Sequence, residues 1–181
     1  MHRVYFDSCC FIELAKGKFG KALLDGGKHI WYLETLLRAS RAGKIQVVTS
    51  TLTVVECVGA GDDTSADVQH LFMGLLTSGK GGVFLLDPDL WVVERARDLR
   101  WKDGLNFKCP DSVHVATALE NGCDELLTMD GVGASAKSIL KRASELQALG
   151  LRAVVPSETL LIPDEFKQHD WVNEDDKKEE A

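Results

Sequence analysis

Short apolar runs typical of β-strands alternate with segments of helical periodicity along most of this chain. The strand-like runs lie at residues 4–6, 45–49, 83–86, 125–129 and 152–155. Helices are expected over residues 9–16, 29–42, 65–77, 90–100, 109–122 and 134–149, with a shorter helix that runs through Glu56. Parallel strands need long crossover connections, which helices supply. The pattern predicts an α/β fold, a three-layer α/β/α sandwich with a central parallel sheet.

The length and composition favour one soluble globular domain. The chain has 181 residues, of which 45% are hydrophobic, and a chain of this size buries about two-thirds of its surface on folding. We find no apolar run near the roughly 20 residues that a membrane span requires. The first residues also lack the apolar core and cleavage site of a signal peptide. We therefore expect a cytoplasmic protein with no membrane partner.

The net charge of −7 is distributed unevenly. Residues 164–181 contain eight acidic and three basic residues and carry −5, so residues 1–163 carry only −2. A terminal charge run of this kind is usually solvated and disordered. We therefore separate a globular domain, residues 1–163, from an acidic C-terminal tail, residues 164–181. A nucleic-acid mimic or a partner-docking segment is the alternative for the tail.

The cysteines indicate a reduced protein without a structural zinc site. There are five, with no Cys-x-x-Cys pair: Cys9, Cys10, Cys57, Cys109 and Cys123. Their spacing does not suit a zinc site. We interpret them as free thiols that act as small hydrophobic side chains.

Four acidic residues lie where a strand-like run ends or a helix begins. Asp7 and Asp130 follow apolar strands, and Glu56 and Asp111 lie in helices. In open parallel sheets the ligand site lies at the carboxyl ends of the strands. Each acid also has a local alternative. Asp7 could cap a helix, Glu56 could complete a capping box with Thr53, Asp111 could favour the helix dipole, and Asp130-Gly131 could form a turn.

Taken together, the four acids predict a divalent metal site. Carboxylates that converge raise one another's pKa values and repel unless a cation neutralises them. Oxygen ligands favour Mg²⁺ or Mn²⁺ over zinc. Such an ion can activate a water molecule and hold a phosphodiester, and two ions can also stabilise the leaving oxygen.

These residues carry a resemblance to a known family. The sequence resembles a PIN-domain ribonuclease and is similar to the VapC-type toxins of toxin–antitoxin pairs. The four matching motifs are Val4-Tyr5-Phe6-Asp7-Ser8, Thr51-Leu52-Thr53-Val54-Val55-Glu56, Asp111-Ser112-Val113-His114-Val115-Ala116-Thr117-Ala118 and Leu127-Thr128-Met129-Asp130. Their order and approximate spacing fit over roughly residues 1–160, and the third motif is the most specific.

The resemblance implies a Mg²⁺- or Mn²⁺-dependent endoribonuclease with a PIN-like fold. Asp7, Glu56, Asp111 and Asp130 would be the catalytic, metal-binding residues, and Ser8 and Thr128 would orient ligands or water. RNA would be the substrate, an antitoxin the protein partner, and a homodimer the expected assembly. Gly131-Val132-Gly133-Ala134 follows the fourth motif where many relatives have another polar residue. One metal or two therefore stays open.

Two other functions compete with a nuclease. One is a non-catalytic PIN-like module that binds RNA or protein. The other is a phosphatase with Asp7 as nucleophile, although such enzymes usually need a second acid at the position that Cys9 occupies. His114 lies three residues after Asp111, and we expect it to be a packed or surface histidine without a catalytic role.

Overall fold

The computed structural model describes residues 1–131 and 137–167. Its five strands form one sheet in the order β3-β2-β1-β4-β5. Every neighbouring pair is parallel, which confirms the predicted α/β class. The strands are β1 (Arg3–Phe6), β2 (Gln46–Ser50), β3 (Val83–Leu86), β4 (Glu125–Leu127) and β5 (Arg152–Val154).

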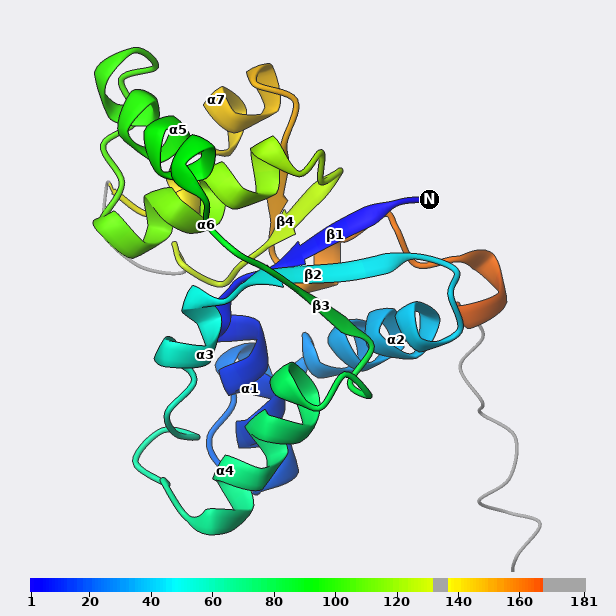
Figure 1. Ribbon diagram of the computed structural model, residues 1–181. Coiled ribbons are helices and arrows are strands. Elements are labelled where there is room, and N and C mark those ends of the chain that lie inside the picture. Colours follow the sequence, from blue (N-terminus) through cyan, green and yellow to red (C-terminus); the bar gives the residue numbers. More distant parts are fainter. Residues whose placement is uncertain (132–136, 168–181) are drawn as a thin grey trace, which may run out of the picture.

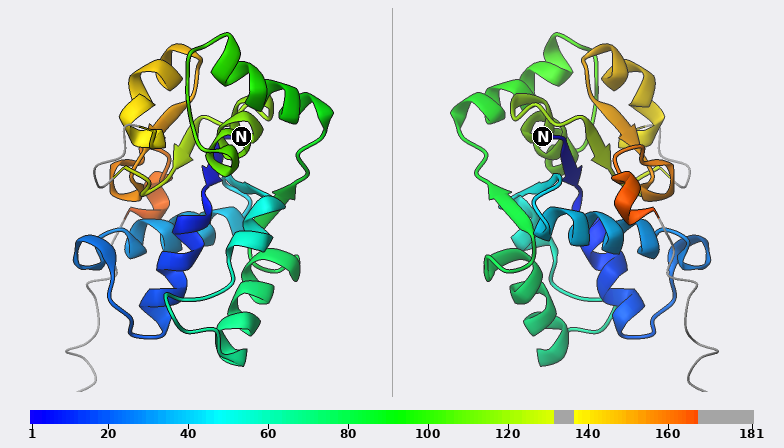
Figure 2. Two further views of the ribbon diagram at one scale, coloured as in Figure 1. Left: turned by 90° about the vertical axis from the view of Figure 1, so that its left-hand side faces the viewer. Right: turned by 90° about the vertical axis from the view of Figure 1, so that its right-hand side faces the viewer.

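Helices cover both faces of the sheet (Figure 1). On one face lie α1 (Ser8–Lys18), α2 (Ile30–Arg41) and α4 (Ala66–Phe72). On the other lie α5 (Leu90–Trp101), α6 (Cys109–Glu120) and α7 (Ala143–Ala148). The short helix α3 (Leu52–Glu56) follows the carboxyl end of β2. The side views in Figure 2 show the same layers, with the sheet between them.

The alternation of side chains along β1 explains how one strand serves two cores. Val4 and Phe6 belong to the cluster packed under α1 and α2, whereas Tyr5 belongs to the cluster under α5 and α6. Successive side chains of a strand point to opposite faces. All three are fully buried, so the first strand is fixed from both sides and its carboxyl end is held firmly.

The predicted helix over residues 134–149 is only partly correct. Residues 134–136 lie outside the described residues, Ile139–Arg142 form a 3₁₀ turn, and α7 starts at Ala143. The backbone amides of Ile139 and Leu140 donate to the side chain and the carbonyl of Asp130, at 3.1 and 3.2 Å. These bonds tie the segment to the end of β4 and delay the start of the helix.

The predicted helix over residues 65–77 changes character near its end. After α4, Met73–Thr77 form a π-helical turn, closed by a bond from the Ser78 amide to the Met73 carbonyl at 2.9 Å. The Thr77 and Ser78 hydroxyls also donate to backbone carbonyls of the preceding turn. Such side-chain bonds compete with the regular α-helical pattern, which explains the wider turn.

Short 3₁₀ turns complete the described chain. They span Leu24–Gly27, Pro156–Glu158 and Asp164–Phe166. In the last of them Phe166 packs against the larger core cluster, and Glu165 pairs with Lys44 at 3.0 Å. The remainder of the predicted acidic tail, residues 168–181, lies outside the described residues. No described helix is both long enough and apolar enough to cross a membrane.

Candidate metal centre

Asp7 lies at the carboxyl end of β1, where it is 6% exposed and caps α1. The expected capping role is therefore correct, but it occupies only one oxygen. Oδ1 accepts a hydrogen bond from the Ser8 amide at 2.7 Å, and Oδ2 accepts one from the Thr128 hydroxyl at 2.7 Å. The Asp7 amide also donates to the Leu127 carbonyl at 3.1 Å. Ser8 and Thr128 thus fix the orientation of this carboxylate.

Glu56 and His114 meet beside Asp7. His114 Nε2 lies 2.7 Å from Glu56 Oε2 and 3.6 Å from Asp7 Oδ1. One donor atom from each of these three residues lies within 4.8 Å of the other two. The alternative capping box is wrong, because Thr53 lies inside α3 and bonds to the Thr49 hydroxyl at 2.6 Å.

Asp111 and Asp130 lie close enough to interact with this group. Asp111 is in the first turn of α6, and burial raises its pKa to about 6, with further contributions from the charges of Asp130 and Asp7. Asp130 follows β4, and its Oδ2 accepts the Ile139 amide at 3.1 Å. Its own amide donates to the Thr128 hydroxyl at 3.0 Å. Charge interactions thus link Asp111 to Asp130 and Asp7, whereas only Asp7 and Glu56 of the four predicted acids belong to the close group with His114.

The pair of Glu56 and His114 carries complementary charge. Burial would raise the pKa of Glu56, but the hydrogen bond and the charge of His114 outweigh it, so the pKa is lowered. Burial would lower the pKa of His114, but the bond to Glu56 and the charges of Asp7, Glu56 and Asp111 raise it. Each partner therefore favours the charged form of the other.

The residues present fit a divalent cation. Among the described residues, the buried Oδ2 of Asp111 has no hydrogen-bond partner. A buried, unpartnered carboxylate oxygen beside two further acids is costly unless a cation approaches it. Carboxylate oxygens suit Mg²⁺ and Mn²⁺, and Mn²⁺ also tolerates a nearby imidazole.

Two residues outside the predicted set of site residues lie at this site, and the prediction that His114 is a packed or surface histidine is correct as to packing. His114 is packed, at 1% exposed, and its ring bonds to Glu56 of α3 and to the hydroxyl of Tyr5 of β1, each at 2.7 Å. Its position three residues after Asp111 on one helix was the available signal. Cys9 was assigned to the core, yet its Sγ lies 3.4 Å from Asp7 Oδ2. Its position two residues after Asp7 was the corresponding signal.

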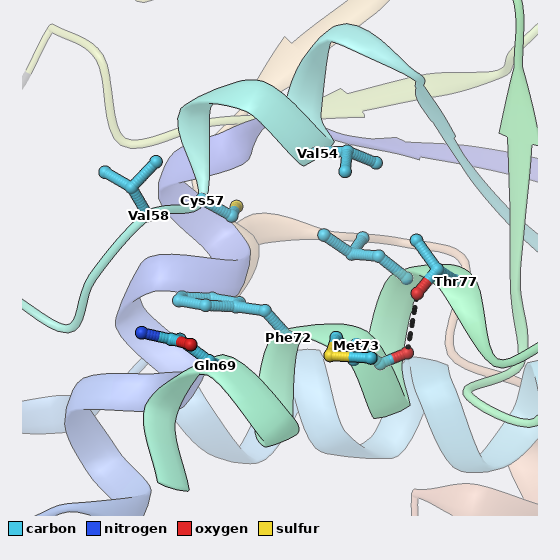
Figure 3. Close-up of a pocket in the computed structure, with 8 residues that line it drawn as sticks. Val54, Cys57, Val58, Gln69, Phe72, Met73 and Thr77 are labelled. Carbon is cyan, nitrogen blue, oxygen red and sulfur yellow. Dashed lines mark hydrogen bonds between the residues drawn. The ribbon is translucent and has the colours of Figure 1, made fainter. Parts of the chain in front are cut away.

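A separate apolar pocket lies between α3 and α4 (Figure 3). Its volume is about 430 Å³, and no carboxylate lines it. Val54, Val58, Phe72 and Met73 point into or flank it in Figure 3. Val58 and Met73, which line the pocket, are 67% and 59% exposed, so the pocket presents apolar surface to solvent, whereas Glu56, the last residue of α3, belongs to the acidic site.

The architecture matches solved toxin–antitoxin structures. A chain of the "Toxin-antitoxin complex from Klebsiella pneumoniae" is 20% identical, with a TM-score of 0.52, over 86% of this chain and 99% of that chain. VapBC2 from Rickettsia felis, solved with a promoter DNA fragment, matches at 12% identity and a TM-score of 0.54, over 83% and 98%. DNA-bound VapBC from Salmonella typhimurium matches at 14% identity and a TM-score of 0.52, over 86% of this chain and 99% of that chain.

This chain has a VapC-like PIN fold. The predicted resemblance is confirmed at the level of the fold, because identities of 12–20% support the shared architecture only. No protein-family model matches the chain, and no curated protein matches it. Asp7 and Asp130 follow the paired strands β1 and β4, and Asp7 lies beside Glu56 of α3 and His114 of α6.

Proposed function

We propose that this protein is an endoribonuclease that depends on Mg²⁺ or Mn²⁺ and hydrolyses RNA phosphodiester bonds. Asp7, Glu56, Asp111 and Asp130 would hold the ion. One observation carries the proposal: Asp111 has a buried carboxylate oxygen without a partner, next to the charges of Asp7 and Asp130. A cation would remove the repulsion that this arrangement otherwise imposes.

The chain's own residues prepare the site before any substrate binds. Ser8 and Thr128 hold Asp7 from two sides, and the Ile139 amide holds Asp130. When bound, the metal would lower the pKa of a water molecule and polarise the phosphate. Because the chain then needs no side-chain nucleophile, and because Cys9 occupies the position where such enzymes usually need a second acid, the phosphatase alternative, with Asp7 as nucleophile, has less support.

The experiment is cleavage of a mixed RNA by the purified protein with Mn²⁺. We expect endonucleolytic products, loss of cleavage with EDTA, and loss of cleavage in Asp7→Asn. Glu34→Gln, on the exposed side of α2, is the control and should cleave as the wild type does. Intact RNA from a protein free of any co-purified inhibitor would contradict the proposal.

A non-catalytic PIN-like binding module is the second candidate. It is favoured by the strong sequence divergence from the solved neighbours, at 12–20% identity. Calorimetry with Mn²⁺ separates the two functions. Heat of binding at millimolar metal favours the nuclease, whereas no heat, together with RNA binding that EDTA does not alter, favours the module.

An antitoxin-like protein partner is part of the proposal, because the neighbours were solved as toxin–antitoxin complexes. The apolar surface formed by Val58, Met73 and the rest of the pocket of Figure 3 would receive apolar side chains of that partner. A small reading frame next to this one, co-expressed with it, supplies the test. Val58→Glu should weaken the complex, whereas Leu160→Glu, at an equally exposed apolar position, should not.

The assembly and the location of the protein also belong to this proposal. A homodimer is expected, and light scattering of the purified protein measures it directly. A cytoplasmic location is also expected, because all five cysteines are free and reducing compartments keep thiols in that state. Fractionation of cells that express the protein would test the location.

A further inference from the structure

A chain of hydrogen bonds runs from the sheet to Glu56 through two buried rings. The Ser50 amide, at the end of β2, donates to the Tyr5 hydroxyl at 2.9 Å. That hydroxyl lies 2.7 Å from His114 Nδ1, and His114 Nε2 lies 2.7 Å from Glu56 Oε2. Tyr5 and His114 are at most 1% exposed. The four residues come from four different elements.

The proton positions along this series of hydrogen bonds follow from the groups at its two ends. The ionised carboxylate of Glu56 can only accept a hydrogen bond, so Nε2 of His114 carries a proton. At the other end the Tyr5 oxygen accepts from Ser50 and still bonds to Nδ1, as donor when the ring is neutral and as acceptor when it is charged. In both cases the ring is held at two points and cannot turn.

An imidazole held in this way acts on the orientation of Glu56. With its proton directed at Oε2, the Nε2 atom has no lone pair for a metal ion, so His114 is not a ligand in this arrangement. The bond holds Oε2 and so fixes the direction of Oε1, the oxygen that would reach a cation, with the Ser8 side chain as a further neighbour of the carboxylate. Glu56 needs such support because it is the last residue of the five-residue helix α3 and is only half-buried.

We propose that His114 is a positioning residue that aims Glu56 at the metal, and that Tyr5 sets the angle of its ring. This inference rests on the proposed function, since it concerns the same site. Partners that orient metal ligands typically contribute ten- to hundredfold to metal affinity. The Tyr5–His114 edge-to-face contact, with ring centroids 5.8 Å apart, adds packing that keeps the two rings in register.

Two substitutions of His114 separate positioning from simple core packing. His114→Gln places an amide donor near the position of Nε2, and His114→Asn places one near the position of Nδ1. We expect His114→Asn to weaken Mn²⁺ binding by roughly ten- to hundredfold, and His114→Gln to retain most of the affinity. Asn is one methylene shorter than Gln and leaves a larger cavity, so thermal unfolding of both variants accompanies the binding measurement. A purely structural role would lower Mn²⁺ affinity only in step with stability.

Tyr5→Phe tests the part of the hydrogen-bond series that lies beyond His114, away from Glu56. It keeps the ring but removes the hydroxyl, and we expect a smaller loss of Mn²⁺ affinity than in His114→Asn. Tyr32→Phe is the matched control, because it removes the hydroxyl of a partly buried tyrosine on α2, and it should bind Mn²⁺ as the wild type does. The measurement is calorimetry of each EDTA-treated and dialysed protein with Mn²⁺ alone, accompanied by kcat and KM for RNA.

The outcomes separate this inference from the proposed function. If the wild type binds Mn²⁺ and the Gln and Asn variants show equal affinities, the positioning role is overturned and the nuclease proposal stands. If Mn²⁺ binds with the expected order but RNA stays intact, the positioning role stands and the nuclease proposal fails. A wild type that binds no Mn²⁺ overturns both. A fall in kcat without a change in KM for His114→Asn supports positioning at the reacting centre.

Discussion

Buried carboxylates lie at both ends of the strands, and their surroundings differ. Glu125 begins β4 and is 2% exposed. It accepts a hydrogen bond from the Thr159 hydroxyl at 2.5 Å and from the Leu160 amide at 3.1 Å, and it pairs with Arg152. At the opposite end of the sheet, the Oδ2 atom of Asp111 has no partner among the described residues.

The two carboxylates differ in how far the chain itself compensates them. Glu125 is neutralised by a positive side chain and by hydrogen bonds from the chain itself, which is the usual condition for burying an ion. Asp111 faces the charges of Asp130 and Asp7, which raise its pKa together with burial. This contrast is what we expect if the proposed cation binds beside Asp111 and not beside Glu125.

The largest expected effect concerns Glu125, whose charge and hydrogen bonds are satisfied within the chain. Arg152→Met leaves Glu125 buried without its cation, and breaking a buried pair in this way costs about 3 kcal/mol of unfolding free energy. We expect RNA cleavage by the folded variant to be unchanged. Urea unfolding measures the loss. Arg97→Met, at an exposed pair with Glu94, should cost less than about 1 kcal/mol, and an equal loss in both variants would contradict the comparison.

Added metal should stabilise the native protein by binding at the end of the sheet where Asp111 lies. A ligand that binds only the native state stabilises it by about 2.7 kcal/mol at a hundred times its dissociation constant. We therefore expect Mn²⁺ to raise the melting temperature of the wild type clearly and that of Asp7→Asn little. Differential scanning calorimetry at several Mn²⁺ concentrations makes the measurement. Equal shifts in both proteins would mean that the ion binds elsewhere.

Two threonines provide a matched pair across the sheet. Thr128 donates to Asp7 and accepts the amide two residues later, and Thr159 does the same with Glu125 and the amide of Leu161. Thr128→Val should weaken Mn²⁺ binding by about tenfold, because Asp7 loses its support. Thr159→Val should leave Mn²⁺ affinity unchanged and lower stability only. The idea fails if the two variants bind Mn²⁺ equally well.

The smallest effect is a pH dependence of the metal-free protein. The pKa of Asp111 is raised from 3.8 to about 6, so between these values the native state binds more protons than the unfolded state. Stability contributed by this group is therefore lost as the pH rises from about 4 to about 6. Asp111→Asn should gain on the order of 1 kcal/mol at pH 7.5 in EDTA, after allowance for solvent screening, and little at pH 4.

Thermal unfolding of both proteins in EDTA across this pH range provides the data for Asp111→Asn. Excess Mn²⁺ should reverse the sign of the difference, because the carboxylate then binds a cation that asparagine holds poorly. A gain that is as large at pH 4 as at pH 7.5 would show that the charge of Asp111 is not its cause.

Much of the fold was predictable because it depends on local periodicity. The runs at residues 4–6, 83–86 and 152–155 became strands, and Asp7 and Asp130 follow β1 and β4 as predicted. The helix over residues 134–149 was predicted incorrectly at its start. The bonds from Ile139 and Leu140 to Asp130 join residues nine and ten positions apart, beyond the spacing that defines a helix. Local propensity carries no information about such a tie.

The sequence by itself determined the alternation of strands and helices and the placement of carboxylates at strand ends, because both follow from the spacing of neighbouring residues. Only the tertiary structure decided that His114 meets Glu56, 58 residues away, and Tyr5, 109 residues away. Those contacts depend on strand order and on helix docking across the sheet. The chemistry of each residue is local, but which residues become partners is decided by how the layers pack.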